Sequence, residues 1–367
     1  MNTVKQNINI TGTKKRVLVA PLDWGLGHAT RCIPIIEELL IQGFEVFIAA
    51  EKGCAALLRK EFPDLPILPL PGYRITYSAA ESFFFIKMIS QIPKITAAIS
   101  KERRWLQSVI KEYSIDIVIS DNRFGLYSKA AHTIFITHQL NIKTGNRFTE
   151  NPAGKINYKY INRFDECWVP DEPGEENLGG ALSHPVDMPR TPVKYIGSLS
   201  RFEKEDSEES IDLLVMVSGP EPQRTIFENN IMAQICSLNY KTVLVRGLPA
   251  AASFVGKKIS DFVTVYDHLP GKELGKLISS AKIVIARSGY TTIMELASLQ
   301  KKAILVPTPG QKEQEYLAEY LSGKNYCVTI NQNEFDLRIA VEKLDNTKNI
   351  EFPAPCKKIS AAIRSLI

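Results

Sequence analysis

The chain has 367 residues, of which 44% are hydrophobic and 23% are charged, and its formal net charge is +5 at pH 7. This composition is typical of a soluble globular protein, and the length favours two domains over a single core. So mild a charge does not indicate a nucleic-acid-binding protein, and it suits anionic ligands or an anionic membrane surface.

The six cysteines are scattered along the sequence without a C-x-x-C pair. This favours reduced thiols in a cytoplasmic protein over a disulfide framework or a zinc site. The N-terminus lacks the apolar region of a signal peptide, and no segment reaches about 18 uninterrupted apolar residues. We therefore expect neither secretion nor a membrane-spanning helix.

Strand and helix patterns alternate in the first half of the chain. A strand at Arg16–Ala20 is followed by a loop with two glycines, Gly25 and Gly27, and by a helix at Ala29–Gln42. Three further strands are predicted at 44–50, 115–120 and 133–137.

Residues 82–106 mix apolar and basic side chains. Phe83–Ile86 and the isoleucines that follow alternate with cations that include Lys87, Lys94, Arg103 and Arg104. The pattern predicts a helix with an apolar face and a basic rim, which suits the surface of an anionic membrane. The alternative is a core helix whose basic face is solvated.

The second half begins after a charged run at Arg201–Ser210, which is predicted to be an exposed linker. A strand at Ile211–Val217 and a helix from Gln223 are followed by four predicted strands, at 242–246, 262–266, 283–286 and 303–306. Such alternation predicts an α/β protein with parallel sheets covered by helices on both faces.

We predict two Rossmann-like, doubly wound domains that face each other across a cleft. Their bounds are residues 14–200 and 201–354, with a final helix at 355–367 that returns to the first domain. In such sheets ligands bind at the carboxyl ends of the strands, so the loops of both domains should open into the cleft.

The most informative motif lies at Ala286–Ala297. Gly289 allows a tight turn after a buried strand, and the free N–H groups of Tyr290–Thr292 at the start of the next helix form a cradle for phosphate. Glu295 lies one turn further on, beside Thr291 and Thr292. A carboxylate would repel phosphates, so a ribose diol is its better partner. The alternative is an ordinary β–α unit with Ser288 as a cap and Glu295 on the surface.

From about Lys14 onward, these motifs resemble the metal-independent glycosyltransferases of the GT-B fold, specifically family 28. Gly25–His28 resembles the first glycine loop with its histidine, and Arg287–Glu295 resembles the diphosphate and ribose motif. Pro307–Tyr316 resembles the loop that holds the donor sugar. The chain departs from the family in its second glycine loop, at Ser218–Pro222, and in having Gln314-Glu315 where relatives have paired glutamines.

The resemblance implies three groups of site residues. The groups that would bind the donor nucleotide and diphosphate are Ser218, Gly219, Arg224, His268, Leu269, Ser288, Gly289, Tyr290, Thr291, Thr292 and Glu295. The groups that would bind the donor sugar are Gln311, Gln314 and Glu315. The groups on the acceptor side are Gly25, Gly27, Asn122 and His138; the acidic member of the family's cluster near His138 is missing.

His28, after the glycine turn, is placed to take the proton from an acceptor hydroxyl as a general base. Alternatively, a neutral His28 stabilises the turn through a backbone hydrogen bond. Asp23 is the nearby candidate to orient His28 or to act as the base itself.

No Asp-x-Asp motif occurs and the histidines and cysteines do not cluster, so we expect neither a metal site nor a cofactor beyond the nucleotide sugar. Helix N-termini and polar side chains would then stabilise the departing diphosphate. A rival pattern, Gly25-x-Gly27-x-x-Thr30 with Glu51 after the second strand, mimics an NAD or FAD fingerprint. Its third glycine is replaced by threonine, which weakens the match.

The sequence thus predicts an inverting, cytoplasmic glycosyltransferase that uses a nucleotide-diphosphate sugar, with UDP as the favoured nucleotide. Family relatives imply a lipid-linked acceptor, a peripheral position on the inner face of the plasma membrane and a role in the cell envelope. Two alternatives stay open: a UDP-sugar hydrolase or epimerase, and a non-catalytic subunit that binds nucleotide sugars. The sequence does not identify the donor sugar or the acceptor.

Overall fold

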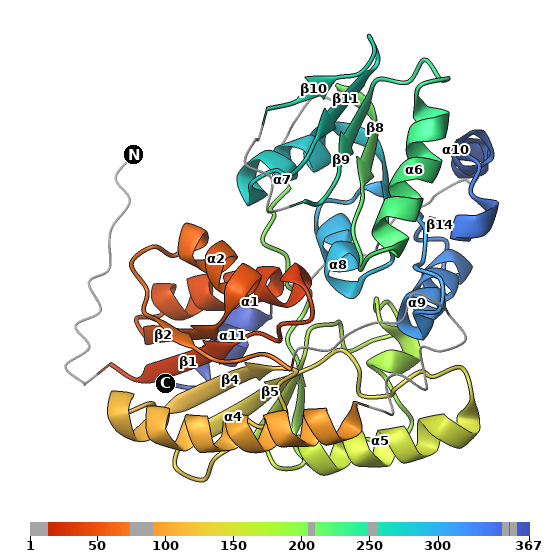
Figure 1. Cartoon of the computed structure of the whole chain (residues 1–367). Coiled ribbons are helices and arrows are strands. Elements are labelled where there is room, and N and C mark those ends of the chain that lie inside the picture. Colours follow the sequence, from red (N-terminus) through yellow and green to blue (C-terminus); the bar gives the residue numbers. More distant parts are fainter. Residues whose placement is uncertain (1–13, 74–90, 205–209, 249–254, 347–351, 353–357) are drawn as a thin grey trace, which may run out of the picture.

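The computed structural model describes residues 14–73, 91–204, 210–248, 255–346, 352 and 358–367. Two seven-stranded sheets form two lobes that meet along one side (Figure 1). Residues 82–90 of the predicted basic helix lie outside the described residues.

The first sheet is parallel throughout. Its strands, in spatial order, are β3 (Ile67–Pro69), β2 (Glu45–Ala50), β1 (Arg16–Ala20), β4 (Ile117–Asp121), β5 (His132–Ile136), β6 (Glu166–Val169) and β7 (Val193–Tyr195). Its helices are α1 (Leu26–Ile41), α2 (Lys52–Glu61), α4 (Ile92–Tyr113) and α5 (Arg147–Ile161), with the short η2 (Gly180–Leu182). The strand order reverses between β1 and β4, where ligands bind in sheets of this kind.

The second sheet is parallel except for the antiparallel pair β10–β11. Its strands, in spatial order, are β10 (Lys257–Lys258), β11 (Val263–Tyr266), β9 (Thr242–Val245), β8 (Ile211–Met216), β12 (Ala281–Ala286), β13 (Lys302–Leu305) and β14 (Val328–Thr329). Its helices are α6 (Gln223–Ile235), α7 (Gly271–Ser280), α8 (Tyr290–Ser298), α9 (Lys312–Gly323) and α10 (Leu337–Asn346), with the short η3 (Gln332–Glu334). Here the order reverses between β8 and β12.

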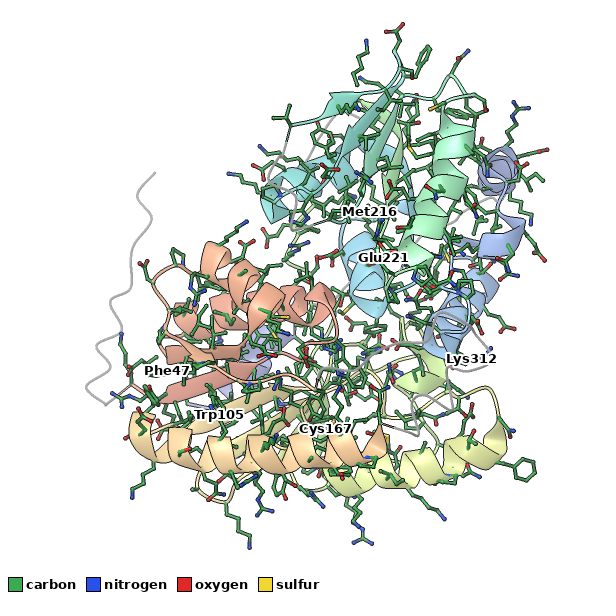
Figure 2. The ribbon with its side chains drawn as sticks, viewed as in Figure 1. Phe47, Trp105, Cys167, Met216, Glu221 and Lys312 are labelled. Carbon is green, nitrogen blue, oxygen red and sulfur yellow. The ribbon has the colours of Figure 1, made fainter. Side chains whose placement is uncertain are left out.

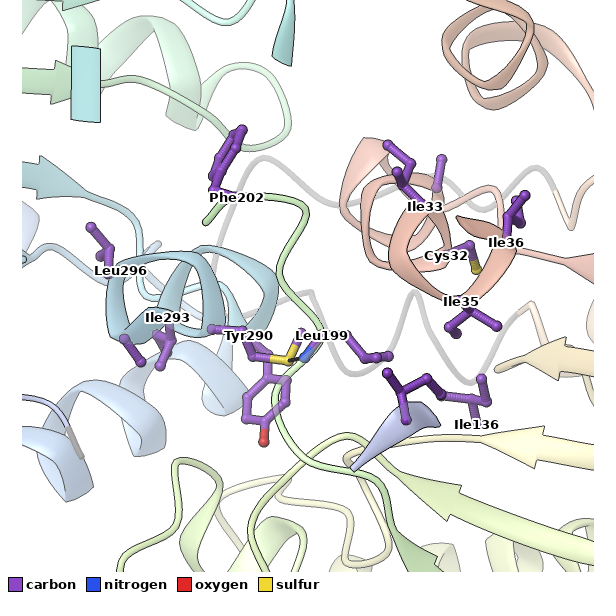
Figure 3. Packing of buried hydrophobic residues seen from close by; sticks show 14 of the residues in the cluster. Cys32, Ile33, Ile35, Ile36, Ile136, Leu199, Phe202, Tyr290, Ile293 and Leu296 are labelled. Carbon is purple, nitrogen blue, oxygen red and sulfur yellow. Dashed lines mark hydrogen bonds between the residues drawn. The ribbon is translucent and has the colours of Figure 1, made fainter. Parts of the chain in front are cut away.

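Alternating side chains of the strands fill cores on both faces of each sheet. Val17 and Val19 of β1 face α1, whereas Leu18 between them packs on the side of α4. The core on the α1 side continues into the second lobe, where it includes Ile293 and Leu296 of α8 (Figure 3). Since α1 and α8 are also in contact, the two lobes share buried apolar surface.

The last helix, α11 (Ile359–Arg364), returns from the second lobe to lie against α1. Gln42 Nε2 donates to the carbonyl of Ser360 (2.9 Å), and Lys15 Nζ donates to the carbonyl of Leu366 (2.7 Å). These contacts join both ends of the described chain to the first lobe.

The prediction of an α/β fold with two parallel-sheet domains is confirmed. Helix α4 differs from the predicted helix because it continues to Tyr113, and its apolar side chains at Ile99, Leu106 and Val109 are buried against the first domain. In its described part, α4 therefore matches the alternative of a core helix with a solvated basic face.

Candidate active site between the two domains

The two reversal points face each other through the loop before α1 and the first turn of α8. Thr291 Oγ1 donates to the carbonyl of Gly27 (3.1 Å). A Cβ at Gly27 would lie 3.2 Å from that hydroxyl, tighter than ordinary contact, and Gly25 has a φ of +148°, which favours glycine. The two glycines thus let the loop turn and approach the opposite domain.

His28 lies in the first turn of α1 with its ring held at one nitrogen. Nδ1 is 2.9 Å from Asp121 Oδ2 and 2.7 Å from Arg31 Nη2. Nε2 has no hydrogen-bond partner in the described part of the chain, and 19% of the side chain is exposed. Burial and Arg31 lower the pKa of His28 more than Asp121 raises it, so the neutral, proton-accepting form prevails at pH 7.

Asp121, at the end of β4, is the carboxylate that His28 contacts. Arg31 donates to it through Nε (2.8 Å) and Nη2. Burial alone would raise the pKa of Asp121, but Arg31 and His28 lower it to about 2. Asp121 is therefore a permanent anion that can orient an imidazole.

The prediction that Asp23 orients His28 is wrong, since Asp121 has that position. Asp23 Oδ1 accepts a hydrogen bond from the backbone N–H of Tyr73 (3.0 Å) and lies 4.0 Å from Arg123. Asn122 has a φ of +54° and donates its backbone N–H to the carbonyl of Ile136 (3.1 Å), so its backbone turns the chain after β4.

His138 lies across the domain boundary from α8 and α9. Its Nε2 is 2.6 Å from Glu313 Oε1, and its ring stacks on that of Tyr290 at 4.1 Å between centroids and 4° between planes. Figure 3 shows Tyr290 projecting from α8 toward the loops of the first domain, where its hydroxyl donates to the carbonyl of Pro170 (2.9 Å). The acidic partner that the sequence lacks near His138 is therefore supplied by α9.

The first turn of α8 has no side-chain cap. Gly289 occupies the cap position without a side-chain hydrogen bond, which leaves the N–H groups of Tyr290, Thr291 and Thr292 at the open end of the helix. Ser288 does not serve as the predicted phosphate ligand through its hydroxyl, because it is fully buried and donates to the carbonyl of Gln314 (2.8 Å). The backbone at this turn remains the candidate anion site.

Just before this turn lies a buried cation, Arg287, which has no carboxylate partner among the residues that the structure describes. The Arg287 guanidinium donates to the carbonyls of Val306 and Pro307 (3.2 Å each) and of Gln223 (3.0 Å), and it lies over the ring of Phe227. Its Nε has no hydrogen-bond partner within the described part of the chain. Burial lowers the pKa of Arg287 to about 10, which still leaves it protonated at pH 7.

Side chains do not crowd the backbone at Gly219, in the loop after β8. Gly219 has a φ of +112°, and a Cβ there would meet only Thr308 Oγ1, at 3.7 Å. That hydroxyl is buried and has no hydrogen-bond partner in the described structure. Gly219 thus lies next to an unsatisfied polar atom, and the role of Ser218 and Gly219 in binding phosphate stays a prediction.

Arg224 is not a free cation near Gly219. Its Nε is 2.5 Å from Glu221 and its Nη1 contacts Glu228, so two carboxylates neutralise it. Glu221 is labelled in Figure 2, near the end of α6 that faces the first domain. The predicted assistance of Arg224 to a phosphate would require Arg224 to leave these partners.

Glu295 is buried rather than on the surface, so that alternative is wrong. Its Oε1 accepts from Arg201 Nε (3.0 Å), which fixes the carboxylate on α8 one turn beyond Thr291. Burial raises the pKa of Glu295 against the opposing effect of Arg201. Near the same side, His268 has a lowered pKa through burial and the cations Lys60 and Arg201, and Leu269 is buried.

The predicted donor-sugar residues hold the loop before α9 in place. Gln314 Oε1 accepts from the N–H of Thr308 (2.9 Å) and its Nε2 donates to Gln311 Oε1 (2.6 Å). Glu315 Oε1 accepts from the N–H of Gly310 (2.9 Å). These contacts hold the loop that carries Thr308.

Three charged residues of the site, Arg31, Asp121 and Glu313, were not predicted from the sequence. The positions of two of them could have been recognised from sequence patterns. Asp121 ends the strand next to β1 at the reversal point, and Arg31 follows His28 at i+3 on one helix face. Glu313 could not have been recognised in this way, because its contact with His138 depends on how the two domains meet.

Within the described residues, no group of three or more histidine, cysteine, aspartate or glutamate side chains could hold a metal ion. None of the helices in the same residues is both long and apolar enough to cross a bilayer.

Comparison with known proteins identifies the class. The Glycosyltransferase family 28 C-terminal domain matches residues 251–365. An uncharacterized glycosyltransferase of Methanosarcina acetivorans is 24% identical over 331 residues, which cover 82% of each chain. The UDP-N-acetylglucosamine–N-acetylmuramyl-(pentapeptide) pyrophosphoryl-undecaprenol N-acetylglucosamine transferase of Haemophilus ducreyi is 22% identical over 319 residues, 84% of this chain and 83% of the relative.

Among solved structures, the glycotransferase of kitacinnamycin has a TM-score of 0.65 at 15% identity, covering 96% of this chain and 95% of that one. The fold and the family match together define this chain as a glycosyltransferase of the GT-B fold. Its similarity within that class is to family 28, as the glycine loop and the Arg287–Glu295 motif predicted.

Proposed function

We propose that the chain is an inverting, metal-independent glycosyltransferase that moves a sugar from a UDP-sugar to an acceptor hydroxyl. One observation carries the proposal. The Gly27–Thr291 contact brings a histidine with a free Nε2 next to a helix N-terminus that can hold a diphosphate. A proton acceptor and an anion cradle are the two things this transfer needs.

In the proposed step, the acceptor oxygen attacks the anomeric carbon of the donor from the side opposite the leaving group. The bond from that carbon to the diphosphate oxygen breaks, and UDP leaves with the electron pair. The hydroxyl proton passes to His28 Nε2, and Asp121 stabilises the imidazolium through Nδ1–H. Attack from the opposite side inverts the anomeric configuration.

The charge of the departing diphosphate would be stabilised by the protein itself. The open N–H groups of α8 and the positive charge of Arg287 both favour an anion, and the Thr308 hydroxyl near Gly219 has no hydrogen-bond partner among the described residues. Since these groups are already in place, no metal ion is required to hold the phosphates.

The nucleotide would extend along α8 toward Arg201. Glu295, oriented by Arg201, would accept hydrogen bonds from the ribose 2′- and 3′-hydroxyls, and uracil would contact the backbone near His268 and Leu269. The name of the Haemophilus ducreyi relative specifies UDP-N-acetylglucosamine as its donor, which supports UDP here.

We also propose a lipid-linked acceptor and a peripheral position on the cytoplasmic face of a membrane, in synthesis of the cell envelope. The same relative acts on an undecaprenol-linked sugar by its name. Helices α4 and α5 lie along one face of the first sheet, and their outward side chains carry many nitrogen atoms (Figure 2). The exposed cations on these helices are Lys94, Lys101, Arg103, Arg104, Lys111, Lys155 and Lys159.

Binding to anionic vesicles tests the membrane proposal. It should weaken with salt and with glutamine at Lys101 and Arg104, each cation being worth on the order of 1 kcal/mol near the surface. If the protein bound neutral and anionic vesicles equally well, and if salt did not weaken the binding, the basic surface of α4 and α5 would not be a membrane-binding surface.

UDP release with and without acceptor tests the reaction. We expect release from UDP-N-acetylglucosamine or another UDP-hexose only when a lipid-linked sugar acceptor is present, and a product of inverted anomeric configuration by NMR. Release of UDP and free sugar without acceptor would favour a hydrolase. Tight UDP binding with no turnover would favour a non-catalytic binding subunit.

A further inference from the structure

Five polar side chains form a continuous path of contacts from one domain to the other. Asp121 contacts both His28 and Arg31; Arg31 Nη1 is 3.4 Å from His138 Nδ1; and His138 Nε2 is 2.6 Å from Glu313. The first four belong to the domain of the general base, whereas Glu313 belongs to the first turn of α9 in the donor-side domain.

Two groups compete for Nδ1 of His28. Asp121 Oδ2, at 2.9 Å, can only accept a hydrogen bond, whereas Arg31 Nη2, at 2.7 Å, can only donate one. If Nδ1 carries the proton and donates to Asp121, Nε2 is free to accept a proton. If Nδ1 instead accepts from Arg31, the proton sits on Nε2, and His28 cannot act as a base.

Glu313 influences this competition through His138. A carboxylate at Nε2 requires that nitrogen to carry the proton, so the neutral ring presents Nδ1 as an acceptor toward Arg31. Gln139 Nε2 donates to the other carboxylate oxygen of Glu313, and the stacked ring of Tyr290 fixes the plane of His138. Arg31 thereby gains an acceptor on the side away from His28.

We propose that Arg31 is a positioning residue that selects the tautomer of His28, and that Glu313, through His138, gives Arg31 a competing acceptor and so favours the tautomer with a free Nε2. The state of the base would then depend on a contact between the two domains. This inference rests on the proposed role of His28 as the base.

The charges that face His28 come from four elements. Arg31 lies on α1 itself, Asp121 ends β4, His138 follows β5 and Glu313 begins α9; the Cys32 thiol lies beside Asp121. Removing the positive charge of Arg31 should raise the pKa of His28, and removing the negative charge of Glu313 should lower it. The two substitutions therefore predict shifts of opposite sign.

NMR titration of histidine-labelled full-length protein tests the proposal without a substrate. The chain has five histidines, so the His28 signal can be assigned by comparison with His28→Gln, and nitrogen shifts distinguish the two tautomers. In Glu313→Gln we expect a lower His28 pKa and more of the form with the proton on Nε2. In Arg31→Met we expect a higher pKa and only the form with the proton on Nδ1.

Glu319→Gln is the matched control, since Glu319 is exposed on the same helix. It should leave both properties of His28 unchanged. Arg31→Lys keeps the charge and shortens the reach, so it should restore the pKa but not the wild-type tautomer mixture. An unchanged tautomer and pKa in a folded Glu313→Gln protein would overturn the proposal, as would equal shifts in Glu319→Gln.

Activity provides a second readout once an acceptor is known. Glu313→Gln should lower kcat by less than the roughly 10²–10⁴-fold expected for loss of the base, leave KM for the donor unchanged and displace the acidic limb of the pH profile. A lower kcat with an unmoved pH profile would contradict the proposal. If wild-type protein transferred no sugar while the NMR shifts appeared as expected, the proposed function would fail and the tautomer control would stand.

Discussion

The loop before α1 and the loop before α8 have the same local architecture but different charge balance. Each follows a central parallel strand, turns at a glycine and opens a helix at a point where strand order reverses. Around the first loop, His28, Arg31 and Asp121 satisfy one another. Around the second, Arg287 has no carboxylate partner among the described residues and the Thr308 hydroxyl has no partner.

This difference shows how one backbone motif supports two tasks. A set of mutually paired charges has almost no net charge and can tune the basicity of a histidine. An unpaired buried cation below an open helix end leaves positive potential for an anion. We therefore assign proton transfer to the first loop and diphosphate binding to the second.

The largest effect should come from His28→Ala, which separates the two tasks. Loss of a general base should lower kcat by about 10²–10⁴-fold and leave UDP affinity nearly intact, because the proposed nucleotide site is in the other domain. Steady-state kinetics and calorimetry measure the two quantities, with His132→Ala as a control outside the site. Loss of UDP binding would make His28 a donor ligand instead.

Arg287→Met should give the complementary result. Removing this buried positive charge should weaken UDP binding by roughly 1–2 kcal/mol through the lost electrostatic potential, whereas the affinity for uridine, which lacks phosphates, should change little. Calorimetry with both ligands makes the comparison within one protein, and circular dichroism checks that the variant is folded. Equal losses for UDP and uridine would point to a collapsed domain rather than a lost phosphate contact.

Glu295→Gln sharpens the assignment within the second region. If the carboxylate holds the ribose diol, the variant should bind uridine less tightly, by roughly 1.5 kcal/mol or more, and should lose its preference for uridine over 2′-deoxyuridine. Stability should also fall, because Arg201 keeps an acceptor oxygen but loses the negative charge of its buried ion-pair partner. An undiminished preference for uridine would leave Glu295 with a structural role alone.

Low pH should destabilise the fold mainly through the carboxylate of Asp121, near the loop before α1. The pKa of Asp121 in the folded chain, about 2, lies below its ordinary value of 3.8, so Asp121 stabilises the fold above pH 4 and loses this effect as the pH falls toward 2. The contribution is about 2 kcal/mol. Asp121→Asn should flatten the dependence of the free energy of unfolding on pH in that range, measured by urea denaturation, and an unaltered dependence would contradict the pairing with Arg31.

Sequence patterns predicted the strands that are buried on both faces, since apolar β-branched runs such as Arg16–Ala20 and Ile211–Val217 carry a strong signal. They missed the short strands at the sheet edges, including β3, β7 and β14, which have only two or three residues and few side chains in the core. Edge strands form because a neighbour offers hydrogen bonds, and that neighbour is distant in the sequence.

The positions of some candidate site residues follow from local structure, others such as Arg31 and Asp121 were overlooked, and the contact of Glu313 depends on how the domains dock. Gly27, His28 and the first turn of α8 follow from strand–turn–helix patterns. The hydroxyl of Ser288 and the guanidinium of Arg224 were assigned to phosphate from their residue types, yet both are committed to protein partners. The contact of Glu313 with His138 exists only because two domains face each other.

Calorimetric titration of the wild-type chain with UDP and with NAD tests the central assignment most directly. The nucleotide-diphosphate site lies in the second domain by this account, whereas the rival dinucleotide pattern lies in the first. We predict that UDP binds, that Arg287→Met weakens its binding and that NAD does not bind. Binding of NAD without binding of UDP would contradict the assignment.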